Sequence, residues 1–399
     1  MPHISERATQ MPASPIRKLA PLASAAKERG VHVYHLNIGQ PDLPTPDKGL
    51  EVLRHIDRKV LEYSPSQGFK SYREKLTHYY EKYNIHLDAD DIIITSGGSE
   101  AVRFAFMSCL NPGDEIIVPE PAYANYMAFA ISAGAVIRTI ATTIEEGFSL
   151  PKVEKFEELI NERTRAILIC NPNNPTGYLY TRREMNQIRA LVKKYDLYLF
   201  SDEVYREFIY TGSPYISACH LEGIEQNVVL IDSVSKRYSE CGIRIGALIT
   251  KNPEVRAAVM KFCQARLSPP LIGQIVAEAS LDEPEDYSRE VYDEYVERRK
   301  CLIDGLNRIP RVYSPIPMGA FYTVAKLPVD DAERFCEWCL TDFSYEGQTV
   351  MMAPAAGFYT TPGAGRNQVR MAYVLKKEDL MRALVVLAEA LKAYPGRTE

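Results

Sequence analysis

The sequence predicts an α/β protein in which a large domain holds a mostly parallel sheet covered by helices on both faces. Short apolar, β-branched runs recur between residues 92 and 249, and stretches with helical periodicity lie between them. Strands that alternate with helices form parallel sheets between helical layers. The runs are continuously apolar rather than alternating in polarity, which is expected of strands that are buried on both faces.

Six runs are predicted as strands of this sheet, and two of the stretches between them as helices. The strands are residues 92–94, 116–118, 166–169, 197–200, 228–231 and 247–249. The helices are residues 101–110 and 183–195. Their lengths are typical of such elements, because buried strands are short and helices run to ten residues or more.

Both ends of the chain have a different pattern. Ser14-Pro15 and the apolar positions after it predict a capped helix that ends at Gly30, and the Pro-rich segment 39–46 predicts an extended linker. Beyond residue 285 we expect a smaller α+β domain. Its predicted elements are a charged helix over 287–306, strands over 319–324 and 369–374, and helices over 333–340 and 377–393.

Composition excludes several classes of protein. The 399 residues are 46% hydrophobic and 25% charged, which suits an ordinary globular chain. A net charge of −5 gives no basis for binding nucleic acid or an anionic membrane. No apolar run approaches the roughly 18 residues of a spanning helix, and the start lacks a signal-peptide core. We therefore expect a cytoplasmic protein.

Cysteine and histidine usage narrows the chemistry. The eight cysteines are scattered, as reduced thiols are in a reducing compartment. Of seven histidines, six lie in the first quarter of the chain and only His220 lies beyond it. We therefore expect neither a His-rich metal site nor a catalytic triad, and predict no metal.

The residues that follow the apolar runs carry the functional signal, because ligands of open α/β sheets bind outside the carboxyl ends of the strands. These segments are residues 95–100, 119–123, 170–177, 201–205 and 232–237. They supply a glycine pair before a helix, an aromatic ring, an asparagine, an acid followed by a tyrosine, and a lysine.

The Gly97-Gly98-Ser99 turn is a candidate phosphate site. Backbone N–H groups at a helix N-terminus bind phosphate through hydrogen bonds and the helix dipole. The glycines could equally serve only a tight strand-to-helix turn. The turn is not a P-loop, because no Lys-Ser or Lys-Thr follows at the required spacing, and the chain has no G-x-G-x-x-G.

Lys236 is the sharper signal. A lysine forms a Schiff base with a carbonyl compound when its surroundings favour the neutral amine. Ser233 and Ser235 precede it and Arg244 follows it. These side chains could bind the second side of a phosphate that the Gly97-Gly98-Ser99 turn binds on the first. A carboxylate at a neighbouring strand end, Asp202, could keep a pyridine nitrogen protonated by charge pairing.

Five motifs in order resemble the class I/II aminotransferases, the pyridoxal 5′-phosphate enzymes of fold type I. The motifs are Asn173-Asn174-Pro175-Thr176-Gly177, Ser201-Asp202-Glu203-Val204-Tyr205, Ser233-x-Ser235-Lys236, Arg244-Ile245-Gly246 and Arg370. With Gly39-Gln40-Pro41-Asp42 the resemblance covers nearly the whole chain. It implies a large domain over residues 46–285 and a small domain built from residues 1–45 and 286–399, that is, from both chain termini.

The resemblance also implies roles for single residues. Lys236 would hold the cofactor covalently and move the substrate's α-proton, and Asp202 would pair with the pyridinium nitrogen. Asn174 and Tyr205 would hydrogen-bond the ring oxygen, and Tyr123 would stack on the ring. The phosphate would be bound by Gly97, Gly98, Ser99, Ser233 and Arg244, with Ser235 as a further candidate.

Substrate and subunit contacts follow in the same way. Arg370 would bind the substrate's α-carboxylate, with Gly39 and Asn174 close by. Tyr63 matches a tyrosine that reaches the phosphate of the neighbouring subunit, so the resemblance implies a homodimer with shared active sites. The implied reaction moves the amino group of an L-amino acid to a 2-oxo acid such as 2-oxoglutarate, and is aspartate aminotransferase-like.

Alternative activities share this constellation. A lyase, of the C–S β-lyase or cyclopropane-carboxylate synthase type, shares the first carbanion, and transamination is the favoured prediction. Transcription regulators with a similar domain carry an N-terminal DNA-binding module, for which 45 residues are too few. Some aspartate aminotransferases have a lysine after the glycine pair where this chain has Ser99. Arg17 is a candidate to replace that lysine as the cation that binds a side-chain carboxylate, although a surface role is favoured for it.

Three other patterns favour structural roles. Cys336 and Cys339 lie on one predicted helix without a second pair, which indicates buried thiols rather than a redox or zinc site. Packing best explains the tyrosine cluster at 79, 80 and 83. Segment 290–300 is predicted to be a solvated helix face, with Glu294 and Arg298 forming an i,i+4 pair.

Overall fold

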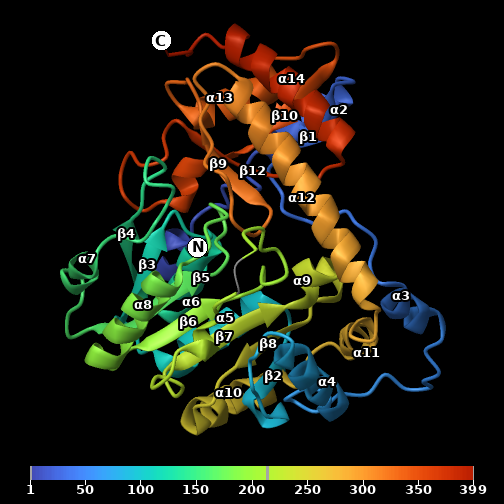
Figure 1. Cartoon of the computed structure of the whole chain (residues 1–399), viewed down its shortest axis with the longest axis vertical. Coiled ribbons are helices and arrows are strands. Elements are labelled where there is room, and N and C mark those ends of the chain that lie inside the picture. The colour runs from blue at the N-terminus through green and yellow to red at the C-terminus, as the bar shows by residue number, and fades with distance from the viewer. Residues whose placement is uncertain (1, 213–214, 399) are drawn as a thin grey trace.

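The computed structural model describes residues 2–212 and 215–398, and its lower part in Figure 1 is built on a seven-stranded sheet. The strand order is β2-β8-β7-β6-β5-β3-β4. The strands are β2 Ile92–Thr95, β3 Glu115–Glu120, β4 Val136–Ala141, β5 Thr164–Cys170, β6 Tyr198–Asp202, β7 Val228–Ser233 and β8 Gly246–Ile249. Strands from β7 to β4 are parallel, whereas β8 is antiparallel to both of its neighbours. The predicted fold class is confirmed.

Helices cover both faces of this sheet, as the continuous apolar runs predict. Successive residues of β7 face opposite layers: Ile231 packs in the cluster that contains α5 (Gly98–Cys109), and Leu230 packs in the cluster that contains α4 (Lys70–Glu81). The face of α4 also holds α8 (Arg182–Tyr195), which covers residues such as Ile167. Strands between two apolar layers need no polar side.

The edge strand β4 is absent from the predicted set. Its sequence contains Arg138 and Thr139, and most of its residues are exposed or half-buried. Because β4 has a partner on one side only, it keeps polar positions and does not form a continuous apolar run.

The remaining strands lie in a second lobe, in the upper part of Figure 1, which is built from both ends of the chain. One sheet has the order β11-β12-β9 and is antiparallel, and the other pairs β1 with β10 in parallel. These strands are β1 His32–His35, β9 Tyr322–Lys326, β10 Gln348–Met351, β11 Ala353–Pro354 and β12 Gln368–Ala372. The β1–β10 pair joins residues more than 300 positions apart, so we call this unit the terminal lobe and the first one the sheet lobe.

The other helices have the following bounds: α1 Glu6–Gln10, α2 Ala20–Glu28, α3 Asp47–Arg54, α6 Asn125–Ala133, α7 Val153–Glu157, α9 Val234–Arg237, α10 Pro253–Arg266, α11 Leu271–Ser280, α12 Glu285–Arg308, α13 Ala332–Thr341 and α14 Lys377–Ala393. None of the described helices has the length and apolar character needed to cross a membrane. The two cysteines of α13, Cys336 and Cys339, are both buried free thiols, as predicted.

The N-terminal helix starts later than the sequence predicts. Residues 15–19 form turns, in which the N–H groups of Arg17 and Lys18 both donate to the Ser14 carbonyl. The helix begins at Ala20, with Pro21 in its first turn, where a missing N–H costs nothing.

The long helix α12 is not solvated throughout, which corrects the prediction for segment 290–300. The predicted Glu294–Arg298 pair forms at 2.7 Å, but Arg298 is only 2% exposed. Its guanidinium also binds the Asp42 carboxylate at 2.6 Å and the Val374 carbonyl. Arg298 therefore ties the linker to the segment that follows β12.

Candidate active site

The carboxyl ends of β5, β6 and β7 bring three predicted site residues to one edge of the sheet. Asn174 follows β5, Asp202 is the last residue of β6, and Lys236 follows β7 in the short helix α9. Asn174 and Asp202 are buried, and Lys236 is half-buried. Parallel neighbours end at the same edge, so residues far apart in sequence meet there.

The amine of Lys236 lies against the linker between the two lobes. Its Nζ donates to the Gly39 carbonyl at 2.8 Å, and the Cys241 sulfur lies 3.9 Å away. The Ser233 hydroxyl accepts a hydrogen bond from the Ser235 N–H and caps the turn that carries the lysine. Gly39 has no room for a side chain, because a Cβ would overlap the Tyr322 hydroxyl.

Asp202 is a buried carboxylate without a counter-ion. The Tyr126 hydroxyl donates to it at 2.5 Å and the Val204 N–H at 3.4 Å, and it forms no ion pair with any described residue. Burial raises the pKa of Asp202 from its usual 3.8 to about 6, although these two hydrogen bonds oppose the shift. A ligand that offers a cation or a protonated nitrogen would relieve the cost of ionising it.

Arg370 is the opposite case, a buried cation that forms no ion pair within residues 2–212 and 215–398. It lies in β12, 1% exposed, and its guanidinium donates to Asn174 Oδ1 at 3.1 Å and to the Asn37 carbonyl. The group lies 4.6 Å from the ring centroid of Tyr322 and 5.0 Å from that of Phe358. Burial lowers the pKa of Arg370, and its Nε has no partner. The arrangement suits a bidentate anion such as a carboxylate.

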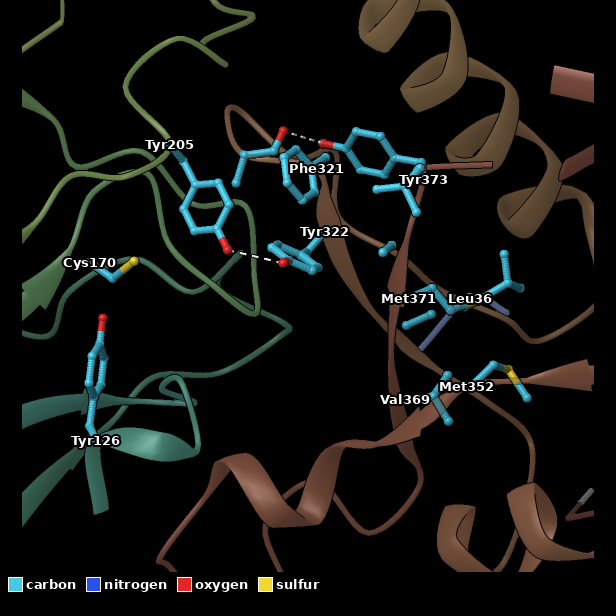
Figure 2. Packing of buried hydrophobic residues seen from close by; sticks show 14 of the residues in the cluster. Leu36, Tyr126, Cys170, Tyr205, Phe321, Tyr322, Met352, Val369, Met371 and Tyr373 are labelled. Atoms are coloured by element: carbon cyan, nitrogen blue, oxygen red, sulfur yellow. Dashed lines mark hydrogen bonds between the residues drawn. The ribbon is translucent and has the colours of Figure 1, made fainter. Parts of the chain in front are cut away.

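A tyrosine pair joins the two lobes between these groups. The hydroxyls of Tyr205, from the sheet lobe, and Tyr322, from the terminal lobe, are 3.0 Å apart, and Figure 2 shows this hydrogen bond. Burial raises the pKa of Tyr205, so its hydroxyl stays a neutral hydrogen-bonding group.

Two of the predicted phosphate residues, Gly97 and Arg244, lie against each other. Gly97 caps α5 with a left-handed φ of 77°, and a Cβ there would overlap the Arg244 guanidinium. Arg244 donates to the Cys241 carbonyl at 3.0 Å and to the Ser96 carbonyl at 3.4 Å. Gly98 and Ser99 belong to the first turn of α5, whose N–H groups have no helical acceptors. A helix N-terminus beside an arginine is suited to an anion.

Tyr63 and Arg17 lie apart from this centre, whereas Tyr123 lies beside it: its ring centroid is 5.3 Å from that of Tyr126, which donates to Asp202. Tyr63 is 75% exposed on the segment before α4 and makes no described contact with the site. Tyr123 is half-buried, and its hydroxyl accepts from Asn125 at 2.8 Å. Burial raises the pKa of Tyr123 to about 12, and the charges of Arg370 and Arg17 oppose the rise. Arg17 is therefore within electrostatic range of the Tyr123 hydroxyl.

Several site residues escape the sequence analysis. Tyr126, Tyr322, Phe358 and Asn37 contact Asp202, Tyr205 or Arg370, and none follows a strand of the large sheet. Helical spacing from Tyr123 gives a signal for Tyr126, since residues three apart share a face. The other three come from the terminal lobe, where no strand-end rule applies.

Comparison with known proteins decides the family. The family model for aminotransferase class I and II matches residues 31–387.

The chain belongs to the class I and II aminotransferases.

Relatives of this aminotransferase cover nearly its whole length. An aspartate aminotransferase of Thermotoga maritima is 31% identical over 96% of this chain and 97% of its own. The structure of an aspartate aminotransferase from Thermus thermophilus with maleate has a TM-score of 0.89 at 28% identity, over 98% of this chain and 100% of its own. A structure of an alanine aminotransferase from Pyrococcus furiosus has a TM-score of 0.89 at 29% identity, with the same coverage. The protein is an enzyme that transfers amino groups.

Enzymes of this family use pyridoxal 5′-phosphate, and the described site fits that group. It offers an amine for the aldehyde, an uncompensated buried carboxylate for the ring nitrogen, and a helix N-terminus with an arginine for the phosphate. The second unpaired charge, Arg370, remains for the carboxylate of a substrate.

The Asp202→Asn change should stabilise the cofactor-free protein above about pH 6. The raised pKa means that the unfolded chain releases this proton first, near pH 3.8, whereas the folded chain releases it near pH 6. Ionisation of the Asp202 side chain therefore destabilises the folded state. This penalty grows between pH 3.8 and about pH 6 and is constant above that range. We expect a gain of roughly 1–3 kcal/mol at pH 8 and none below pH 4, measured by urea unfolding.

The matched control is Asp57→Asn, at an exposed carboxylate, which should leave the stability difference flat with pH. Equal unfolding free energies of Asp202→Asn and wild type at pH 4 and pH 8 would contradict the buried, uncompensated carboxylate.

Proposed function

We propose that this aminotransferase moves the amino group of an L-amino acid to 2-oxoglutarate, with Lys236 and Arg370 handling the amino acid. One observation carries the proposal: the backbone of residues 37–39 contacts both groups, Arg370 at the Asn37 carbonyl and Lys236 at the Gly39 carbonyl. Three residues of extended backbone span at most about 10 Å. A carboxylate bound at Arg370 would thus hold the α-carbon within reach of the Lys236 amine.

The cofactor would be held by residues at the strand ends. Lys236 would bond to its aldehyde carbon, Asp202 would pair with the ring nitrogen, and Asn174 with Tyr205 would hydrogen-bond the ring oxygen. Tyr123 would stack on the ring. The phosphate would lie among Gly97, Gly98, Ser99, Ser233 and Arg244.

The chain's own groups then perform the steps. Arg370, with Gly39 and Asn174 close by, binds the α-carboxylate and orients the α-carbon. The bound cofactor supplies an electron sink for the pair left when the α-proton departs. The Lys236 amine, once displaced by the substrate's amino group, removes that proton and acts as general base. The terminal lobe, which contributes Arg370 and Tyr322, shields the site from water.

We propose that Arg17 selects donors with a side-chain carboxylate. Its side chain is exposed and makes no hydrogen bond or ion pair with any described residue, yet its charge acts on Tyr123. An unpaired cation at the mouth of the site can bind a second carboxylate. The similarity to an aspartate aminotransferase supports this choice, whereas the similarity to an alanine aminotransferase supports a neutral donor.

We further propose a cytoplasmic homodimer with shared sites. The segment around Tyr63 carries exposed apolar side chains: Val60, Leu61 and Tyr63 are each at least 65% exposed. Such a patch is typical of a subunit interface. We also propose that residues 46–285 form the large domain and residues 1–45 with 286–399 the small one, a division that the β1–β10 pairing supports.

Replacing Lys236 tests the reaction. Wild-type protein loaded with pyridoxal phosphate should be yellow and should form glutamate from 2-oxoglutarate with at least one L-amino acid, in a screen that also measures ammonia and pyruvate. Lys236→Ala should lose the visible absorbance and at least about a thousandfold in turnover, because the covalent anchor and the general base are one group.

Lys251→Ala, at an exposed lysine, is the control and should match wild type. A Lys236→Ala enzyme with unchanged colour and turnover would refute the assignment. Ammonia and pyruvate without glutamate would instead favour a lyase.

Arg17→Met should lower the enzyme's activity with aspartate much more than its activity with alanine. Removing the cation takes away a partner of the distal carboxylate, so kcat/KM for aspartate should fall about tenfold or more, while that for alanine stays within about twofold. Lys18→Met changes a neighbouring cation that already pairs with Glu333 and serves as control. Equal effects of Arg17→Met on both donors would exclude the role.

Subunit mixing tests the shared site. Homodimers of Lys236→Ala chains and homodimers of Tyr63→Ala chains should each have low activity at limiting cofactor. In a mixed dimer, one site combines an intact Lys236 with an intact Tyr63 from the other chain. Random reassociation should restore about a quarter of wild-type activity. No recovery in a verified mixed dimer would place Tyr63 outside the neighbouring site.

A further inference from the structure

Four proposed cofactor residues each have a sequence neighbour in one buried charge cluster. The pairs are Asp202 with Glu203, Tyr205 with Arg206, Ser233 with Asp232, and Lys236 with Arg237. We call Glu203, Arg206, Asp232, Arg237 and Tyr80 the charge cluster. All five are at most 5% exposed.

Asp232 is the centre of this cluster. Its carboxylate accepts hydrogen bonds from the Tyr80 hydroxyl at 2.5 Å, from Arg237 Nη2 at 2.5 Å and from Arg206 Nη1 at 3.4 Å. The Ser233 N–H donates to its other oxygen at 2.8 Å. One side chain therefore connects the end of β7, the lysine-bearing turn, the segment after β6 and helix α4.

Glu203 completes the compensation of Arg206. The two form an ion pair at 3.1 Å, and Glu203 also accepts hydrogen bonds from the Ser217 hydroxyl and the Ala218 N–H. The guanidinium of Arg206 lies 5.1 Å from the Tyr80 ring centroid. With two acids and two arginines, the four charged members balance to zero.

Burial alone would raise the pKa of Asp232, but Arg237, Arg206 and the Tyr80 hydrogen bond lower it to about 2. Asp232 is thus ionised throughout the neutral range. Its charge in turn raises the pKa of Asp202.

Stability alone does not account for such a cluster. The desolvation of a buried ion pair cancels much of the energy of its charge attraction, and proteins with apolar residues of similar volume in its place are often as stable. What the pairs do supply is a fixed geometry, since each bond has a defined length and direction. The bonds of Asp232 to the Ser233 N–H, Arg237 and Arg206 fix segments that carry proposed cofactor residues, and its bond to Tyr80 ties these segments to α4.

We propose that Asp232 is a positioning residue for transamination, which holds the turn of Ser233 and Lys236 in register and balances the charge of Arg206 and Arg237 behind the site. The inference rests on the proposed role of Lys236. Asp232 touches neither substrate nor cofactor in this scheme and acts through its neighbours.

The titratable groups around Asp232 come from three segments. They are Tyr72, Tyr79 and Tyr80 of α4, Glu203, Arg206 and Glu207 after β6, and Arg237 and Tyr238 of α9 and its C-cap. The tyrosines stay neutral because burial raises the pKa of each. The arginines stay charged, and Arg237 also pairs with Glu207 at 3.7 Å, so removal of the Asp232 charge makes the surroundings of the site more positive by one unit charge.

Two variants test the proposal. Asp232→Asn removes the charge, and Tyr80→Phe removes one hydrogen bond while keeping the ring. The readouts are the pH midpoint of the visible absorbance change of the cofactor-loaded enzyme, the affinity of cofactor-free protein for pyridoxal phosphate, and kcat and KM measured separately. The matched control is Tyr195→Phe. Tyr195 is the last residue of α8, and the change removes a hydroxyl that donates to Glu157 of α7.

Asp232→Asn should move the absorbance midpoint to lower pH by about 0.3–1 unit, because the loss of one nearby negative charge disfavours the protonated chromophore. Tyr80→Phe should lower kcat about tenfold with KM within about twofold and weaken cofactor binding, since it loosens the turn. Tyr195→Phe should change none of these values.

Unchanged midpoint, kcat and cofactor affinity in Tyr80→Phe, together with lower unfolding stability, would show a merely structural cluster and overturn the proposal. That conclusion holds even if Asp232→Asn does not fold. If Lys236→Ala kept the colour of the wild-type enzyme, the proposed function itself would be overturned. This outcome is distinguishable from failure of the Asp232 proposal, because Lys236→Ala leaves the charge cluster unchanged.

Discussion

The parallel pairing of β5, β6 and β7 is the constraint on which the site depends. Because these strands run in one direction, the residues after them meet at one edge, which Asn174, Asp202 and Lys236 reach from positions spread over about 60 residues of the chain. The antiparallel strand β8 then begins where β7 ends, with Gly246 opposite both Ser233 and Thr95. That reversal returns the residues before β8, and Arg244 with them, to the same edge.

Charge compensation separates two groups of buried residues that look alike in sequence. Asp202 and Arg370 are buried without counter-ions among the described residues, so the fold bears an electrostatic cost that a cationic group at Asp202 and an anionic group at Arg370 would relieve. Asp232, Arg206 and Arg237 are buried with their partners already present. Unpaired buried charges are typical of functional sites and paired ones of the structure that supports them.

The site exists only where the two lobes meet. Arg370 and Tyr322 come from the terminal lobe, whereas Lys236 and Tyr205 come from the sheet lobe, and the Tyr205–Tyr322 contact crosses the junction (Figure 2). The linker segment 37–39 contacts both sets. A movement of the lobes would therefore change the distance between the proposed carboxylate site and the proposed base, as in other enzymes that close over their substrates.

The sequence alone determined the fold class, six of the seven strands of the large sheet, the family and the chemical types at the strand ends, because periodicity and short motifs are local properties of the chain. Tertiary structure decided what each side chain meets. It placed Arg298 in the interior rather than in solvent, made Tyr80 a donor to the buried Asp232 carboxylate, and brought Tyr126 and Tyr322 to Asp202 and Tyr205. These partners lie tens to hundreds of residues away, and only the packing of helices on the sheet and of one lobe on the other selects them.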